Sequence, residues 1–193
     1  MKIKMMISLL SLAGICTIVP ANAADENMSF FITSEGSGNG GNLGGLEGAD
    51  AHCTKLASTV GSKKTDWKAY LSTEADGKRG ISARDRIGKG PWHNAKGVLI
   101  AENISELHLY NKTINKDTAL NEKGEQVNGR GDKPNEHDIL TGSMNDGTAF
   151  FPDDKDHTCN NWTSSDKGSA QVGHHDRHGG GNLSWTSAHG SRG

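Results

Sequence analysis

Hydrophobic positions recur at helical spacing in one early segment of the chain. The periodic positions are Leu46, Ala49, Cys53, Leu56, Ala57 and Val60. Residues three or four apart share one face of an α-helix. The pattern therefore predicts an amphipathic helix over residues 46 to 58, with Cys53 on its buried face.

Short apolar runs elsewhere predict strands. Residues 67 to 71 alternate apolar and polar side chains, which is typical of a half-buried strand. Further runs lie at residues 30–33, 98–101, 139–140, 150–151 and 183–185. One helix combined with several short strands, most of them late in the chain, predicts an α+β fold.

Two polar segments interrupt this pattern. Residues 36–45 are rich in glycine and precede the predicted helix, but they lack the lysine and the serine or threonine of a phosphate-binding loop. We expect a structural turn there. Residues 111–134 contain few large apolar side chains and predict a long surface loop.

The N-terminus has the features of an export signal. Lys2 and Lys4 precede an apolar run, which ends at Ala21-Asn22-Ala23. We expect cleavage after Ala23, a mature domain over residues 24–193 and a secreted or periplasmic protein. Lipidation at Cys16 is an alternative, although Ile15 occupies a position that favours a small residue. No later segment is apolar enough to predict a membrane span.

Composition indicates a thin hydrophobic core. The chain has 26 glycines among 193 residues, and 33% of its residues are hydrophobic. Large aromatic side chains must then supply much of the buried area, so we expect the four tryptophans to be buried: Trp67, Trp92, Trp162 and Trp185. Charges of both signs are mixed along the chain, which argues against a nucleic-acid partner.

Several motifs in order resemble bacterial secreted lectin-like domains, which are related in fold to C-type lectins and endostatin. The motifs run from Phe31-Ile32-Thr33-Ser34 and Gly41 to Cys53 through Gly90-Pro91-Trp92, Leu140-Thr141-Gly142, Cys159-Asn160-Asn161-Trp162 and Val172-Gly173-His174-His175-Asp176-Arg177 to Ser184-Trp185. The resemblance implies one domain with a C-type-lectin-like fold, short strands and long loops. It does not fix a ligand.

The cysteines depart from that family. Its members usually carry nested disulfides, whereas only Cys53 and Cys159 follow the predicted signal. The resemblance thus implies that the sequence is truncated before further cysteines and a terminal strand. A Cys53–Cys159 disulfide remains an alternative, but the fold would place these thiols in different bridges, and we expect both to be free.

Calcium is an open alternative, although we predict no cofactor. Calcium-dependent sugar binding in C-type lectins uses Glu-Pro-Asn or Gln-Pro-Asp and Trp-Asn-Asp tripeptides, which this chain lacks. The nearest match is Lys133-Pro134-Asn135-Glu136 with Asp138. A second acidic loop contains Asp153, Asp154 and Asp156.

Histidines gather near the C-terminus, at His174, His175 and His178 around Asp176. His174 and His178 would share a face only in a helix, which the neighbouring glycines disfavour, and zinc would need a further ligand such as His157 or His189. We therefore predict no metal site and a structural role for this segment. The other residues with predicted structural roles are Cys53, Cys159, Trp162 and Trp185.

These observations predict a secreted, non-enzymatic binding module for carbohydrate or another extracellular surface. Amides and carboxylates suited to sugar hydroxyls lie in the late loops, and the candidate ligand-binding residues are Asn135, Glu136, Asp138, Asn145 and Asp146. Two alternatives stay open. One is a periplasmic metal-dependent hydrolase that uses the His174 to His178 cluster, and the other is a structural envelope protein.

Overall fold

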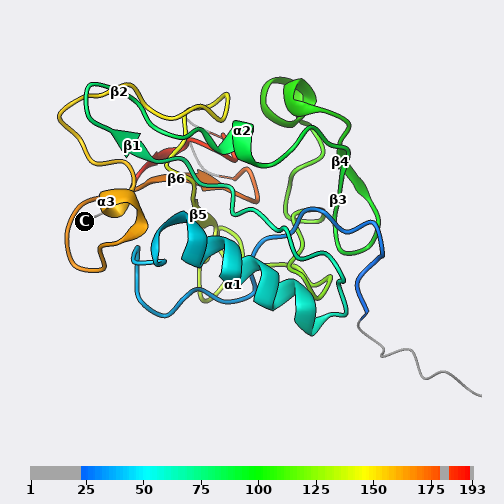
Figure 1. The fold of residues 1–193 in the computed structure, drawn as a ribbon. Coiled ribbons are helices and arrows are strands. Elements are labelled where there is room, and N and C mark those ends of the chain that lie inside the picture. Colours follow the sequence, from blue (N-terminus) through cyan, green and yellow to red (C-terminus); the bar gives the residue numbers. More distant parts are fainter. Residues whose placement is uncertain (1–22, 179–182, 192–193) are drawn as a thin grey trace, which may run out of the picture.

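A computed structural model describes residues 23–178 and 183–191 (Figure 1). Helices and small antiparallel sheets are mixed along the chain, so the α+β class is confirmed. The predicted export signal lies almost wholly outside the described residues. Among the residues described, no helix combines the length and the apolar character needed to cross a bilayer.

Helix α1, Gly45–Thr59, confirms the predicted helix almost to the residue. It follows Gly44, whose φ of 75° is a left-handed conformation that favours glycine. Ala49, Leu56 and Ala57 are buried on its inner face. Cys53 lies half-buried on the same side, in contact with two of the core clusters.

Within the described residues, seven short strands form three antiparallel sheets. Two are two-stranded: β1 (Glu74–Ala75) pairs with β2 (Lys78–Arg79), and β3 (Trp92–His93) pairs with β4 (Leu99–Ala101). The third sheet has the order β5-β6-β7, formed by Asp138–Leu140, Gln171–His174 and His189–Gly190. The strands predicted at 98–101 and 139–140 are confirmed. The expectation that most strands come late is wrong, because β1 to β4 all precede residue 102.

Four predicted strands are wrong. Residues 30–33 form no strand, and only Ile32 makes an isolated bridge, to Asn121. Residues 67–71 keep their alternating burial, but they join no sheet, and the Ala69 amide donates to the Asp50 carboxylate instead. Residues 150–151 and 183–185 also lie outside any strand. Phe151 is 65% exposed, and the Arg79 guanidinium lies over its ring. Short runs of this kind become strands only where a partner backbone lies alongside.

The long segment 111–134 has no helix or strand, as predicted, but its placement on the surface is wrong. Ile114, Leu120 and Glu122 are at most 2% exposed. The Glu122 carboxylate accepts hydrogen bonds from the amide and the hydroxyl of Ser34, at 3.0 and 2.5 Å. The segment is therefore a folded part of the core. Its polar side chains hydrogen-bond to backbone groups, such as the Ser34 amide, that no strand pairs.

All four tryptophans are buried, with exposures of 6% or less, which confirms that prediction. Trp92 and Trp185 belong to one core cluster, Trp67 to a second and Trp162 to a third. Two indoles also donate hydrogen bonds to backbone carbonyls, Trp162 to Ser72 at 2.8 Å and Trp185 to Leu107 at 2.9 Å.

Three short helical elements complete the described part of the fold: α2 (Ala83–Arg86), the π-helical turn η1 (Glu106–Tyr110) and α3 (Cys159–Trp162). In α3, all four residues have φ between 46° and 64°. This left-handed turn is costly for residues that carry a Cβ. The Thr158 hydroxyl accepts from the Asn161 amide, and the fully buried Trp162 fixes the turn against Ser72.

Candidate functional site

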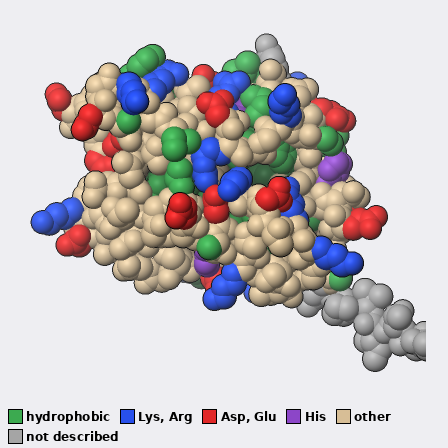
Figure 2. Space-filling model, viewed as in Figure 1, with side chains coloured by type: hydrophobic (Ala, Val, Ile, Leu, Met, Phe, Trp, Pro, Cys, Tyr) green, Lys and Arg blue, Asp and Glu red, His purple; other side chains and the backbone are tan. Residues whose placement is uncertain are grey.

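A groove of about 810 Å³ lies between α1, the segment 29–37, the segment 64–71 and β5. Half-buried rings of Phe30, Phe31 and Tyr70 line it. Glu136 and Asp138 add carboxylates. Figure 2 shows a hollow above α1, with hydrophobic side chains inside and charged side chains around it.

An ion pair holds one wall of the groove. Arg86 Nη2 lies 2.8 Å from both carboxylate oxygens of Asp50, and the same carboxylate accepts from Lys68 and from the Ala69 amide, each at 2.9 Å. Burial alone would raise the pKa of Asp50, but these donors outweigh it and hold the pKa below its ordinary value. The Asp50 carboxylate in this wall is therefore ionised at neutral pH.

The five predicted ligand-binding residues do not converge. Glu136 and Asp138 line the groove, and Asn135 precedes them on the same exposed segment. Asn145 lines a smaller hollow, together with His108, Arg177 and Trp185. The Asp146 carboxylate accepts from the amide and the hydroxyl of Thr148, so it shapes its own turn.

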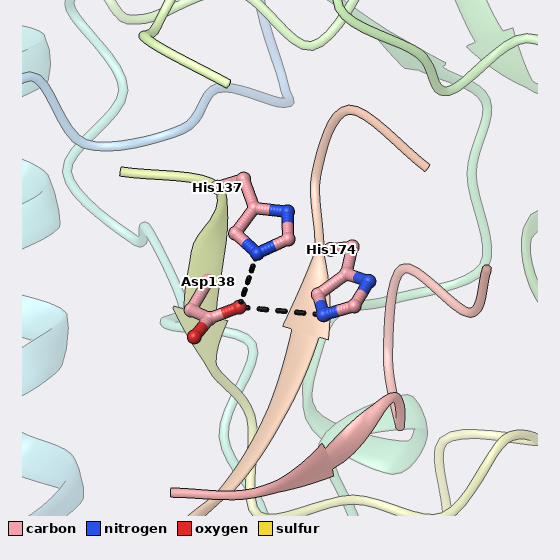
Figure 3. Close-up of side chains that lie close together, drawn as sticks. All are labelled: His137, Asp138 and His174. Atoms are coloured by element: carbon pink, nitrogen blue, oxygen red, sulfur yellow. Dashed lines mark ion pairs between the residues drawn. The ribbon is translucent and has the colours of Figure 1, made fainter. Parts of the chain in front are cut away.

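A cluster of side chains that the sequence did not predict lies on the β5-β6-β7 sheet. This His–Asp cluster consists of His137, Asp138, His174 and His189 (the first three in Figure 3). One oxygen of Asp138, Oδ1, lies 3.1 Å from His137 Nε2, 3.3 Å from His174 Nε2 and 3.6 Å from His189 Nε2. The rings of His137 and His174 stack, with centroids 4.2 Å apart.

Strand register explains this convergence. Asp138 stands directly opposite His174, and His189 stands opposite Val172. Because residues two apart on a strand share a face, His189 is the diagonal neighbour of His174. His137 comes immediately before β5, where the ladder has not begun, and its ring turns to the same side.

Burial shapes the electrostatics of the cluster. His174 is 5% exposed, whereas the side chains of Asp138 and His189 are almost half exposed. Burial first, and the neighbouring His137 second, lower the pKa of His174. Its ring is therefore mainly neutral at pH 7, and neither ring nitrogen has a hydrogen-bond partner within the described residues.

The segment predicted to be structural around Asp176 is held mainly by backbone groups. His175 is fully buried, with Nε2 3.1 Å from the Asn128 carbonyl. Asp176 accepts from the amides of Arg130 and His178, at 2.6 and 3.0 Å. His178 contributes its amide here, and its side chain is exposed. Among the described residues, the group that could share a metal ion contains His137, Asp138 and His174, and His178 is not part of it.

The reactive side chains near the groove are held protonated. Cys53 lines it, and burial raises the pKa of this thiol to about 11. Burial also raises the pKa of Tyr70, whose hydroxyl lies 2.6 Å from His108 Nε2. Cys53 and Cys159 are both free thiols. Cys159 lies instead against Gly41, where a Cβ would come within 2.5 Å of its sulfur.

The sequence gives only a weak indication of the His–Asp cluster. The sequence offers His189 only as a distant zinc ligand and gives no reason to join His137 to it, because 52 residues separate the two and nothing local relates them. The adjacent His137-Asp138 pair, at the start of a predicted strand, was the available signal. Comparison with known proteins adds no assignment, since no family model and no curated protein matches the chain.

Proposed function

We propose that the chain is an exported binding domain of C-type-lectin-like fold that recognises carbohydrate at an extracellular surface without chemical turnover. The observation that carries the proposal is the groove beside α1, because it combines rings with carboxylates in one concave site. Pockets that are mainly apolar, with a few placed polar groups, are typical of ligand sites.

The groove offers both contacts that a sugar ring uses. A pyranose has an apolar face, which can pack against the half-buried rings of Phe30, Phe31 and Tyr70. Its hydroxyls can donate to the carboxylates of Glu136 and Asp138, and bonds to charged acceptors are the stronger kind. Charged side chains at the edge of the groove can replace the water molecules that hydrogen-bond to the sugar hydroxyls in solution.

The motifs that resemble secreted lectin-like domains support the proposed fold, and the state of the nucleophiles supports binding without chemical turnover. Cys53 and Tyr70 both line the groove, and burial raises the pKa values of the Cys53 thiol and the Tyr70 hydroxyl. Neither is ionised at neutral pH, so neither is prepared to attack a substrate. Binding, rather than covalent catalysis, fits this chemistry.

A glycan array with the exported full chain tests the proposal, followed by calorimetry on the glycans that bind. We expect Glu136→Gln to weaken binding about tenfold or more, because a charged acceptor becomes neutral. Asn145→Ala, in the separate hollow, should bind like the wild type and serves as the matched control.

Parallel arrays with calcium and with a chelator test whether calcium takes part. Equal binding in both would exclude it, and the acidic groups of the groove would then act alone. Absence of any bound glycan, or equal losses in Glu136→Gln and Asn145→Ala, would refute the proposal and favour a structural role in the envelope.

A further inference from the structure

We propose that the His–Asp cluster is a binding site for a divalent transition-metal ion of the zinc class. His137, His174 and Asp138 are the principal ligands, and the exposed His189 completes the set. The inference shares Asp138 with the groove proposed for carbohydrate, but the other three ligands lie outside the groove lining, and Zn²⁺ binding is measured without any sugar.

The spacing of the donor atoms fits a metal centre. Zinc bonds to imidazole nitrogen and carboxylate oxygen at about 2.0–2.1 Å, so the ligand atoms of a tetrahedral site stand about 3.3 Å apart. The Nε2 atoms of His137, His174 and His189 lie 3.1, 3.3 and 3.6 Å from Asp138 Oδ1. One ligand atom each from His137, Asp138 and His174 can be chosen so that all three lie within 4.8 Å of one another.

The buried ring of His174 supplies a second observation. Both of its nitrogens are shielded from solvent and lack a hydrogen-bond partner in the described part of the chain, although Asp138 Oδ1 is only 3.3 Å from Nε2. A buried polar atom without a partner costs about 1–3 kcal/mol. A metal ion bound to His174 Nε2 would use the nitrogen lone pair, which accepts no hydrogen bond from the described residues.

Neighbouring groups orient two of the rings. His189 Nδ1 lies 2.9 Å from the Gly190 carbonyl, so a proton on Nδ1 leaves Nε2 free to coordinate. His137 Nδ1 lies 3.5 Å from the buried Asp176 carboxylate without a hydrogen bond to it, so a small shift would bring this carboxylate behind the ring. Carboxylate or carbonyl partners behind the ligating histidines are usual in zinc sites.

Metal ions can reach the cluster from solvent, and its ligands favour ions that bind imidazole nitrogen. Side chains of Asp138 and His189 are 46% and 49% exposed, which leaves an entry path from solvent. Three imidazoles and one carboxylate suit Zn²⁺, Co²⁺, Ni²⁺ or Cu²⁺ better than Ca²⁺, which prefers six to eight oxygens. Asp138 also lines the groove, so the ion would lie at its edge.

Calorimetry and elemental analysis with Zn²⁺ alone test the site, on full-length exported protein without a histidine tag. We expect one ion per chain. His174→Ala should weaken Zn²⁺ binding about a hundredfold, and His189→Ala about tenfold. His178→Ala keeps full affinity and is the matched control, because this histidine is exposed near the cluster but outside it.

The His189→Ala variant should fold, because this histidine is exposed and its replacement leaves the core intact. Zn²⁺ should raise the melting temperature of the wild type and of His178→Ala, and much less that of His189→Ala. Co²⁺ should give the intense visible absorption of a tetrahedral centre, lost in His174→Ala. Equal affinity in all variants, or no stoichiometric zinc, would overturn the proposal while leaving the glycan result untouched.

Discussion

At the scale of single residues, Asp50 has the most concentrated set of interactions among the charged groups described. Its carboxylate accepts hydrogen bonds from Arg86, Lys68 and the Ala69 amide. Arg86 also donates a hydrogen bond to the Ala69 carbonyl, at 2.8 Å. The side chains of Asp50 and Arg86 are only 15% and 11% exposed. Such a pair, shielded from water, is costly to break from one side.

We expect Asp50→Asn to lower the free energy of unfolding by about 2–3 kcal/mol at neutral pH, because Arg86 loses its partner charge. The pKa of Asp50 is depressed below 3.8 in the folded state. Its contribution is therefore complete above that value and is lost as the pH falls through the folded pKa.

Urea unfolding of the wild type and of Asp50→Asn over a series of pH values measures this contribution. The difference between the two should be constant from about pH 5 upward and should shrink as the medium becomes more acidic. Asp66→Ala, an exposed acid nearby, should stay within about 0.5 kcal/mol of the wild type. A difference that grows toward low pH would contradict the assignment.

At the scale of elements, strand β6 depends on the absence of a side chain at Gly173. A Cβ built there would lie 1.8 Å from the Trp185 carbonyl oxygen. The segment that carries Trp185 therefore packs directly on the β6 backbone. This close approach holds His174, the next residue, in place beside Asp138.

Gly173→Ala should lower the free energy of unfolding by about 2–3 kcal/mol or prevent folding, because backbone atoms cannot make room for the methyl group. Gly190→Ala is the matched control on the neighbouring strand β7, where a Cβ meets nothing within 4 Å. Chemical unfolding followed by circular dichroism compares them. Equal stability of the two variants would show that the segment can shift away from β6.

At the scale of the whole molecule, the core of the described part of the chain divides into three clusters, and each contains at least one tryptophan. Because the sheets are short, these indoles connect segments that no strand ladder joins. Trp162 is fully buried and donates to Ser72, whereas the indole nitrogen of Trp67 is buried with no hydrogen-bond partner among the described residues.

Trp162→Phe should therefore be more destabilising than Trp67→Phe, although both remove the same atoms. We expect losses of about 2–4 kcal/mol for Trp162→Phe, which leaves the Ser72 carbonyl without its donor, and about 1–2 kcal/mol for Trp67→Phe. Urea titrations of both variants measure the difference. The reverse order would show that packing volume, and not the hydrogen bond, dominates at these positions.

The sequence by itself determined the features that depend on local pattern and on amino-acid type. Helical periodicity fixed α1 to within a residue at each end, because the repeat of apolar positions acts within a few turns. The scarcity of aliphatic side chains required the four tryptophans to be buried. The α+β class and the strands at 98–101 and 139–140 also follow from local runs.

Only the tertiary structure decided which short runs pair and which polar side chains meet. Residues 67–71 have the alternation of a strand but bind Asp50 on α1 instead, and Glu122 is buried because Ser34 supplies its donors. His137 and His189 meet His174 because the register of β5, β6 and β7 places them on one face. Register depends on contacts between distant segments, so no local pattern in the chain shows that His174 and His189 join the His137-Asp138 pair.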